Sequence, residues 1–196
     1  MAPTFSRLTR YDFLKALAVV GAVGLLFLVV AGFTQTGAAD GAKTSKNAIK
    51  NFVGEAGNDN SSPIFGVRIP DGYRQWELIS PSQSEKELKG IVGNGVALKA
   101  YRDGKLPFPD GSILVKLSWK REPLDGFDGA FSPGPSTMVQ VMVKDSKKYA
   151  STGGWGFGRF IEGKPVDAAQ HNTCFACHSR NAKVREQDFV FTQLAP

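Results

Sequence analysis

The sequence predicts an α+β domain built on a mostly antiparallel β-sheet with a few short helices, the last of them near the C-terminus. Three observations indicate this class. Short runs of alternating apolar and polar residues recur along the chain, with glycine and proline turns between them. Runs with helical spacing are few and short. The most regular alternation, over residues 112–120, does not fit a bundle of helices.

The strand over residues 112–120 is the clearest element in the chain. Ile113 and Leu117 share one of its faces, and Lys116 lies on the other. Further strands are expected over residues 74–79, 89–92, 137–143 and 155–161. The last of these contains two interior glycines, which weaken a strand unless another group must approach its backbone closely.

Helices are expected at three places. Helical spacing over residues 96–101 ends before Gly104, a residue type that commonly follows a helix. A second short helix is expected over residues 144–150. Asp167 is a candidate N-cap for the final helix.

Two segments rich in glycine and proline predict connections. Residues 107–111 form a rigid turn that leads into the clearest strand. Residues 122–135 predict a loop whose aromatic anchors are Phe127 and Phe131.

Residues 1–39 predict a signal peptide or an N-terminal membrane anchor. Arg7, Arg10 and Lys15 precede an uncharged apolar run over residues 16–33, which is long for a cleaved signal and just long enough to span a bilayer. Both alternatives export the remainder of the chain, because the positive charges stay in the cytoplasm. The protein is therefore expected in the periplasm, either soluble after cleavage or tethered to the inner membrane through residues 16–33.

Residues 40–62 predict a linker, since they are polar and small and end in glycine, asparagine and serine. Apolar residues within the linker have helical spacing over 49–56, so a short helix is an alternative to a partly ordered tether. The folded domain is expected over residues 63–196. Its basic side chains are scattered and not aligned on one helix, so the net charge of +6 gives little support to nucleic-acid binding.

The final helix contains the motif that indicates most about a cofactor, Cys174-Phe175-Ala176-Cys177-His178. Two thiols about one helical turn apart can both reach the vinyl groups on one edge of a porphyrin, and the following imidazole then points at the iron. The motif predicts a c-type haem, with Cys174 and Cys177 as the attachment points and His178 as an axial ligand. A flat haem face would also explain the two glycines of the strand over residues 155–161.

Two other interpretations of the cysteines remain open at this point. A zinc site would need His171 as well as the motif, and adjacent Cys177 and His178 can hardly both complete one tetrahedron. A redox dithiol has no need for the adjacent histidine.

Several motifs, taken in order, resemble the cytochrome P460 family over roughly residues 63–196. They are Phe108-Pro109-Asp110-Gly111 before Val115-Lys116-Leu117, then Val143-Lys144-Asp145, Trp155-Gly156-Phe157, the haem motif and a closing Asp188-Phe189-Val190-Phe191-Thr192. The resemblance implies a small antiparallel β domain, often a homodimer, with one c-type haem. In the defining members of the family a lysine is bonded to the porphyrin ring, and Lys116 occupies the place of that lysine. The related beta-type cytochromes c′ share the fold without this bond, so an unmodified Lys116 is the alternative.

The resemblance further implies that His178 is the only protein ligand to iron, which leaves the opposite iron face open. The candidates to line that open face are Met138, Gln140, Met142 and Arg159. Core packing is the alternative for the two methionines. His171 is expected at the surface beside the helix and not as a sixth ligand.

An open iron site of this family implies redox chemistry on small nitrogen species such as hydroxylamine or nitric oxide, with electrons passing to a redox partner protein. Members that oxidise hydroxylamine use a carboxylate as a proton acceptor, whereas the strand over residues 137–143 offers Gln140 and no acid. The alternative is a non-catalytic cytochrome that binds nitric oxide or carries electrons.

Overall fold

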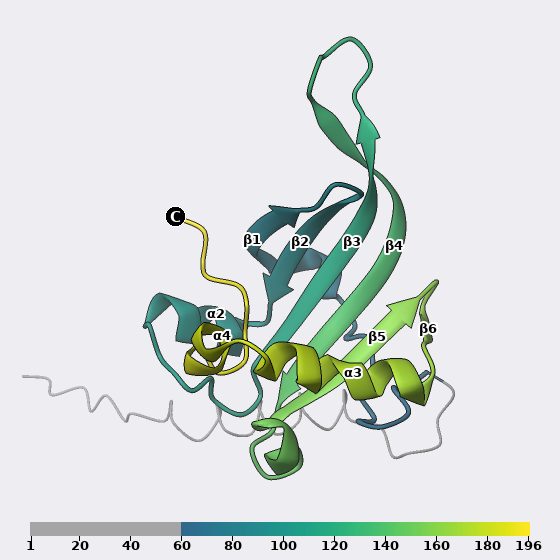
Figure 1. Ribbon diagram of the computed structural model, residues 1–196. Coiled ribbons are helices and arrows are strands. Elements are labelled where there is room, and N and C mark those ends of the chain that lie inside the picture. The colour runs from purple at the N-terminus through teal and green to yellow at the C-terminus, as the bar shows by residue number, and fades with distance from the viewer. Residues whose placement is uncertain (1–59) are drawn as a thin grey trace, which may run out of the picture. The chain divides into compact units, whose positions relative to one another are not determined.

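The computed structural model of the protein describes residues 60–196. Within this range the chain forms a six-stranded antiparallel sheet in the order β1-β2-β3-β4-β5-β6, with short helices around it, which confirms the predicted α+β class (Figure 1). The expected signal or anchor segment, and all of the expected linker before residue 60, lie outside the described residues. No helix within residues 60–196 has both the length and the apolar character needed to cross a membrane.

The elements follow one another as short strands and helices. The strands are β1 (Glu77–Gln83), β2 (Glu87–Gly93), β3 (Ile113–Pro123), β4 (Phe131–Lys144), β5 (Trp155–Ile161) and β6 (Lys164–Pro165). The helices are α2 (Gly95–Arg102), α3 (Ala168–Ser179) and α4 (Ala182–Glu186), with 3₁₀ turns η1 (Tyr73–Gln75) and η2 (Ala150–Thr152).

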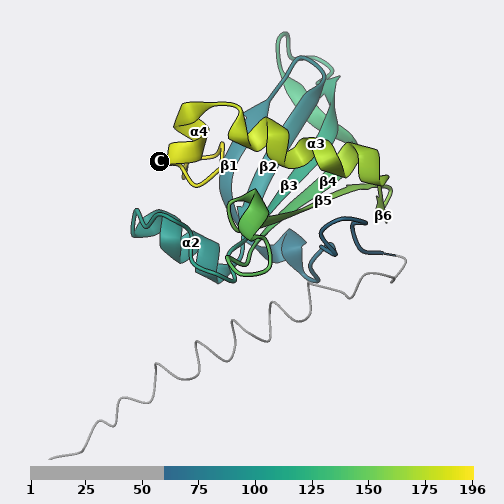
Figure 2. The same cartoon turned by 60° about the horizontal axis from the view of Figure 1, so that its bottom comes forward.

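The two faces of the sheet have different roles. One face carries the aliphatic side chains of the main core, including Val115 and Val141, which pack against the segment around Val67. The other face lies under α3, which crosses β3, β4 and β5 in both views (Figures 1 and 2). Leu114, Met142 and Phe157 stand on this second face, because they pair directly across β3, β4 and β5 and paired residues in neighbouring strands point to the same side.

Several predicted elements are confirmed. The strands expected over residues 89–92, 112–120, 137–143 and 155–161 correspond to β2, β3, β4 and β5. The helix expected before Gly104 is α2, and Gly104 has the left-handed φ of +61° that suits its position. Asp167 caps α3 by accepting a hydrogen bond from the Gln170 N–H at 2.8 Å.

The first predicted strand was wrong at its start. Residues Tyr73–Gln75 form a 3₁₀ turn after Gly72, which has a φ of +66°, and the strand begins only at Glu77. A bulge between Leu78 and Ser80 then shifts the alternation, so that Ile79 is buried and Leu78 is 53% exposed.

The loop predicted over residues 122–135 was too long. β3 runs to Pro123 and β4 begins at Phe131, so the connection spans only residues 124–130. This hairpin projects beyond the neighbouring strands (Figure 1), where prolines interrupt no ladder with a third strand. Phe127 is 67% exposed and anchors nothing, whereas Phe131 lies under the Arg121 guanidinium at 3.4 Å from the ring centroid.

The helix predicted over residues 144–150 was also wrong. Lys144 ends β4, and the Asp145 carboxylate accepts hydrogen bonds from the N–H groups of Lys147 and Lys148, which closes a turn in place of a helix. After the 3₁₀ turn η2, Gly153 and Gly154 both have positive φ and lead the chain directly into β5.

The glycines of β5 have a different reason from the one expected. A Cβ atom at Gly156 would overlap the Tyr149 ring, and one at Gly158 would overlap the Phe160 ring. Both missing side chains would therefore point into the main core and away from α3. Aromatic packing on that face therefore accounts for the lack of a side chain at both glycines.

Candidate haem site

The helix α3 presents Cys174, Cys177 and His178 at the covered face of the sheet. Both thiols are free; Cys174 is half-buried and Cys177 is exposed. Burial raises the pKa of the Cys174 thiol. Their spacing places both sulfur atoms about one turn apart on the same helix, which is the arrangement expected for attachment to one edge of a porphyrin.

His178 has one ring nitrogen engaged and one available. Because a carbonyl can only accept, Nδ1 donates a hydrogen bond to the main-chain oxygen of Phe189 at 2.7 Å. The imidazole packs against the rings of Phe157 and Phe191, with centroids 5.1 and 4.7 Å away. Burial lowers the pKa of His178, so the imidazole is neutral at pH 7 and Nε2 is the atom that can bind a metal.

A cavity of about 1040 Å³ separates the sheet face from α3, α4 and the C-terminal segment. It lies at the upper end of the range for small-molecule and cofactor sites. In the described part of the chain, no aspartate or glutamate side chain lines this cavity, and the lining cations are Lys89, Lys116, Arg159 and Lys183. This charge distribution suits an anionic ligand.

Three of the predicted site residues stand in one row across the cavity wall. Lys116 on β3 pairs with Gln140 on β4, and Gln140 pairs in turn with Arg159 on β5. Burial is the main reason that the pKa of Lys116 is lowered, and the charges of Lys89 and Arg159 lower the pKa further. Neutral amine is therefore more abundant at Lys116 than at an exposed lysine.

The two methionines occupy different surroundings. Met142 lines the cavity and packs against the apolar cluster that includes Phe157. Met138 lies on the same sheet face but not in the cavity wall, and its sulfur accepts a hydrogen bond from Arg159 Nε at 3.1 Å. Only Met142 of this pair borders the candidate site.

The expectation that His171 lies at the surface was wrong. His171 is completely buried, and both ring nitrogens have main-chain partners. Its Nδ1 donates to the Asp167 carbonyl at 2.9 Å, and its Nε2 accepts from the Arg159 N–H at 3.1 Å. Because neither nitrogen is free, His171 serves to fasten the first turn of α3 to β5.

The residues around the cavity fit a haem. Two thiols and a neutral imidazole with a free Nε2 match the donor set of a c-type site, and the cationic wall matches the two carboxylates of a porphyrin. Within residues 60–196, no group of three histidine, cysteine, aspartate or glutamate side chains is arranged to hold a metal ion directly.

Comparison with known families decides between the remaining interpretations. The family model described as Cytochrome P460 matches residues 70–192, which is more than half of the chain. The chain belongs to the cytochrome P460 family. No curated protein matches it. Membership confirms the resemblance found in the sequence and identifies the protein as a haem c cytochrome.

Sequence reasoning missed part of this cytochrome P460 site. Lys89 and Ile91 line the cavity from β2, and residues 190–196 close it from the C-terminal side. The two-residue spacing of Lys89 and Ile91 was a usable signal that they share a face. Their position beside Lys116 follows only from the strand register, in which Ile91 pairs with Lys116.

Proposed function

We propose that this cytochrome P460 protein holds one haem through thioethers to Cys174 and Cys177, with His178 as the only protein ligand to iron and an open site on the other iron face. The observation that carries the proposal is the geometry of His178, whose Nδ1 is engaged by Phe189 and whose Nε2 is free beside the cavity. An open site is supported by the surroundings of His171 and Met138, and Met142, which lines the cavity, is the residue whose ligation would close it. Both nitrogens of His171 are engaged, and the Met138 sulfur accepts from Arg159.

The bound haem supplies one-electron redox chemistry and an iron that binds small ligands. The chain orients the ligand imidazole through the Phe189 carbonyl and through packing against the rings of Phe157 and Phe191. The lysine and arginine side chains of the wall offset the charge of the porphyrin carboxylates.

We further propose that Lys116 carries the lysine bond to the porphyrin ring. Its location in the cavity wall and its lowered pKa support this role, because the neutral amine is the nucleophile. The new bond replaces one N–H of Lys116 and one C–H of the ring. Two protons and two electrons leave in the process, so the step needs an oxidant such as hydrogen peroxide.

The proposed reaction is redox chemistry on a small nitrogen species such as hydroxylamine. Oxidation of hydroxylamine to nitric oxide releases three protons and three electrons, which require a base and an electron-accepting partner protein. The neutral side chain of Gln140 cannot accept a proton at pH 7. The lack of a carboxylate side chain among the described cavity-lining residues therefore favours a second candidate function, non-catalytic binding of nitric oxide or electron transfer.

Export of the domain to the periplasm, with cleavage or with tethering through residues 16–33, is part of the proposal and rests on the N-terminal sequence pattern. A homodimer is proposed from the family resemblance. Chromatography with light scattering, applied to protein purified from the periplasmic and membrane fractions, tests location and oligomeric state together.

Steady-state oxidation of hydroxylamine by fully haem-loaded protein, with an artificial electron acceptor, separates the two functions. Turnover that is lost in a His178→Ala variant supports the enzyme. A fully loaded protein that binds nitric oxide but shows no turnover would overturn the enzyme and leave the binding function.

A further inference from the structure

Two consecutive residues with unusual backbone geometry bring the Phe189 carbonyl to His178. Asp188 and Phe189 follow α4 with φ values of +53° and +64°, a left-handed conformation that is uncommon for residues other than glycine. A backbone held in this region costs free energy and persists only where the surroundings determine it. The surroundings of these two residues therefore explain how the acceptor for His178 is placed.

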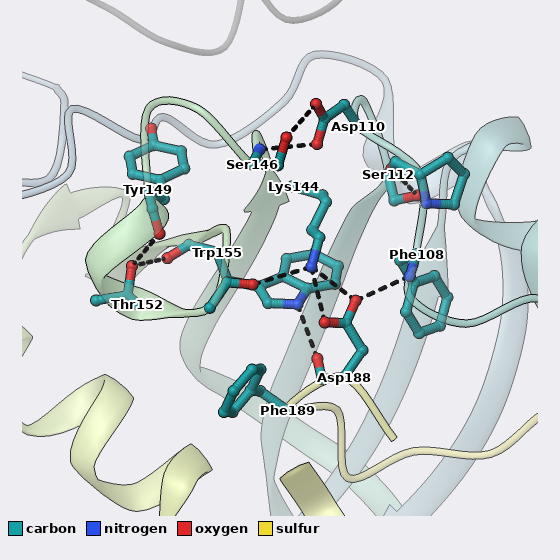
Figure 3. Close-up of polar contacts among 12 residues, drawn as sticks. Phe108, Asp110, Ser112, Lys144, Ser146, Tyr149, Thr152, Trp155, Asp188 and Phe189 are labelled. Carbon is teal, nitrogen blue, oxygen red and sulfur yellow. Dashed lines mark hydrogen bonds and ion pairs between the residues drawn. The ribbon is translucent and has the colours of Figure 1, made fainter. Parts of the chain in front are cut away.

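A buried ion pair holds the first of these residues (Figure 3). The Lys144 Nζ lies 2.7 and 2.8 Å from the two carboxylate oxygens of Asp188, and it also donates to the Gly153 carbonyl at 3.0 Å. The two side chains are only 5% and 8% exposed. The end of β4 is thus connected to the segment that follows α4.

Further contacts fix Asp188 from other elements (Figure 3). Its carboxylate accepts a hydrogen bond from the Phe108 N–H at 2.8 Å, and its main-chain carbonyl accepts one from Trp155 Nε1 at 2.8 Å. The Phe189 ring occupies the space that a Cβ atom at Gly153 would need. Asp188 and Phe189 are consequently held by the β2–β3 connection, by β4 and by β5.

Stability alone is a weak reason for such a pair. The free energy needed to remove two charges from water often exceeds the attraction between them, and apolar side chains of similar volume commonly stabilise a core equally well. A charged pair does, however, fix the position of its members through directional hydrogen bonds. Here the ion pair fixes Asp188, which is the residue next to Phe189, and the Phe189 carbonyl accepts the hydrogen bond from His178.

We propose that Lys144 and Asp188 are positioning residues that hold the Phe189 carbonyl against Nδ1 of His178 and so set how strongly this imidazole donates electrons to iron. The inference rests on the proposed role of His178 as the axial ligand. A well-aligned acceptor at Nδ1 raises the basicity of the ligating nitrogen, and a more basic ligand favours ferric over ferrous iron. The ion pair therefore keeps the reduction potential low.

The test compares haem-loaded variants by spectroelectrochemical titration and by urea unfolding. Asp188→Asn keeps the shape of the side chain, and asparagine tolerates a positive φ. Lys144→Met removes the ammonium at similar length. The double variant removes both charges and leaves neither partner buried alone. Val115→Ala, in the core on the opposite sheet face, is the matched control for a general loss of stability.

We expect a more positive midpoint potential in both single variants and in the double variant, with the double variant more stable than either single one. Val115→Ala should lose stability and keep the wild-type potential. Trp155→Phe, which removes the donor to the Asp188 carbonyl together with part of the ring that packs against Phe108 and Lys144, is the variant to use if the charge variants fail to fold, and its potential should also rise.

Wild-type potentials in every folded variant would overturn the inference, as would an equal shift in Val115→Ala. If the spectrum of the wild-type protein shows that no histidine is bound to iron, both this inference and the proposed function are overturned. Unchanged potentials in a histidine-ligated protein would overturn the positioning role alone.

Discussion

The main-chain N–H of Arg159 donates a hydrogen bond to Nε2 of His171 at 3.1 Å. This contact joins the strand that contributes Arg159 to the cavity wall with the helix that carries both cysteines and His178. The helix therefore has a fixed position over the sheet, even though its own side chains are largely exposed.

Replacing His171 with alanine should lower the free energy of unfolding by about 2–4 kcal/mol, because the change opens a cavity and leaves a buried N–H without an acceptor. Urea unfolding of the haem-loaded protein measures this loss. Alanine at exposed Asn172, on the same helix, should change stability by less than about 0.5 kcal/mol. Equal effects of the two substitutions would contradict the fastening role of His171.

The rate at which the proposed Lys116 bond forms should depend on pH, because only the neutral amine of Lys116 can attack the ring. Because the pKa of Lys116 is lowered, the rate should rise with pH and level off below the ordinary lysine pKa. The measurement is the change in the Soret band after peroxide is added to haem-loaded protein that has not yet formed the bond, at a series of pH values.

Two neighbours should move this pH profile in opposite directions. Lys89 lowers the pKa of Lys116, so Lys89→Gln should shift the profile to higher pH and slow the reaction roughly two- to tenfold at a fixed pH on its rising part. Glu87 raises the pKa of Lys116, so Glu87→Gln should shift the profile to lower pH. A pH-independent rate, or shifts of the same sign, would refute the assignment of Lys116 as the nucleophile.

A carboxylate at position 140 should increase hydroxylamine oxidation. Gln140 pairs with Arg159 on β5, and the Arg159 guanidinium would keep a glutamate ionised and able to accept a proton. We expect roughly tenfold to hundredfold faster turnover in Gln140→Glu than in the wild type, measured in the steady state with an artificial electron acceptor. Gln140→Leu is the control for a change of shape alone. Wild-type turnover equal to that of Gln140→Glu would show that the proton leaves by another route.

Alanine at Gly156 should destabilise the domain by about 1–3 kcal/mol, because the new methyl group overlaps the Tyr149 ring in the main core. The absorption spectrum of the haem-loaded variant should match the wild type, since the methyl group points away from the cavity. A changed spectrum at unchanged stability would instead support the original expectation that this glycine makes room for the haem.

The elements that sequence reasoning located correctly are predicted by residues that lie close together in the sequence. The alternation in β3 and the cap at Asp167 each depend on residues a few positions apart. The motif of Cys174, Cys177 and His178 is likewise contiguous. Such patterns survive in the folded protein because no distant contact opposes them.

The features that sequence reasoning missed depend on contacts between distant segments. Lys144 and Asp188 are 44 residues apart, and neither residue type predicts burial. The sequence predicts His171 at the surface because its partner, the Arg159 N–H, belongs to another element. The prolines of the long β3–β4 hairpin predict a loop because they argue against a strand, and only the projection of the hairpin beyond the sheet makes them acceptable.

The most direct test of the central claim is the absorption spectrum of the dithionite-reduced, haem-loaded protein before and after carbon monoxide is added. Iron with His178 as its only protein ligand should bind carbon monoxide within the mixing time and shift the Soret band. A reduced spectrum with sharp low-spin bands that carbon monoxide leaves unchanged would show a second protein ligand, and it would contradict the open iron site on which the proposed function rests.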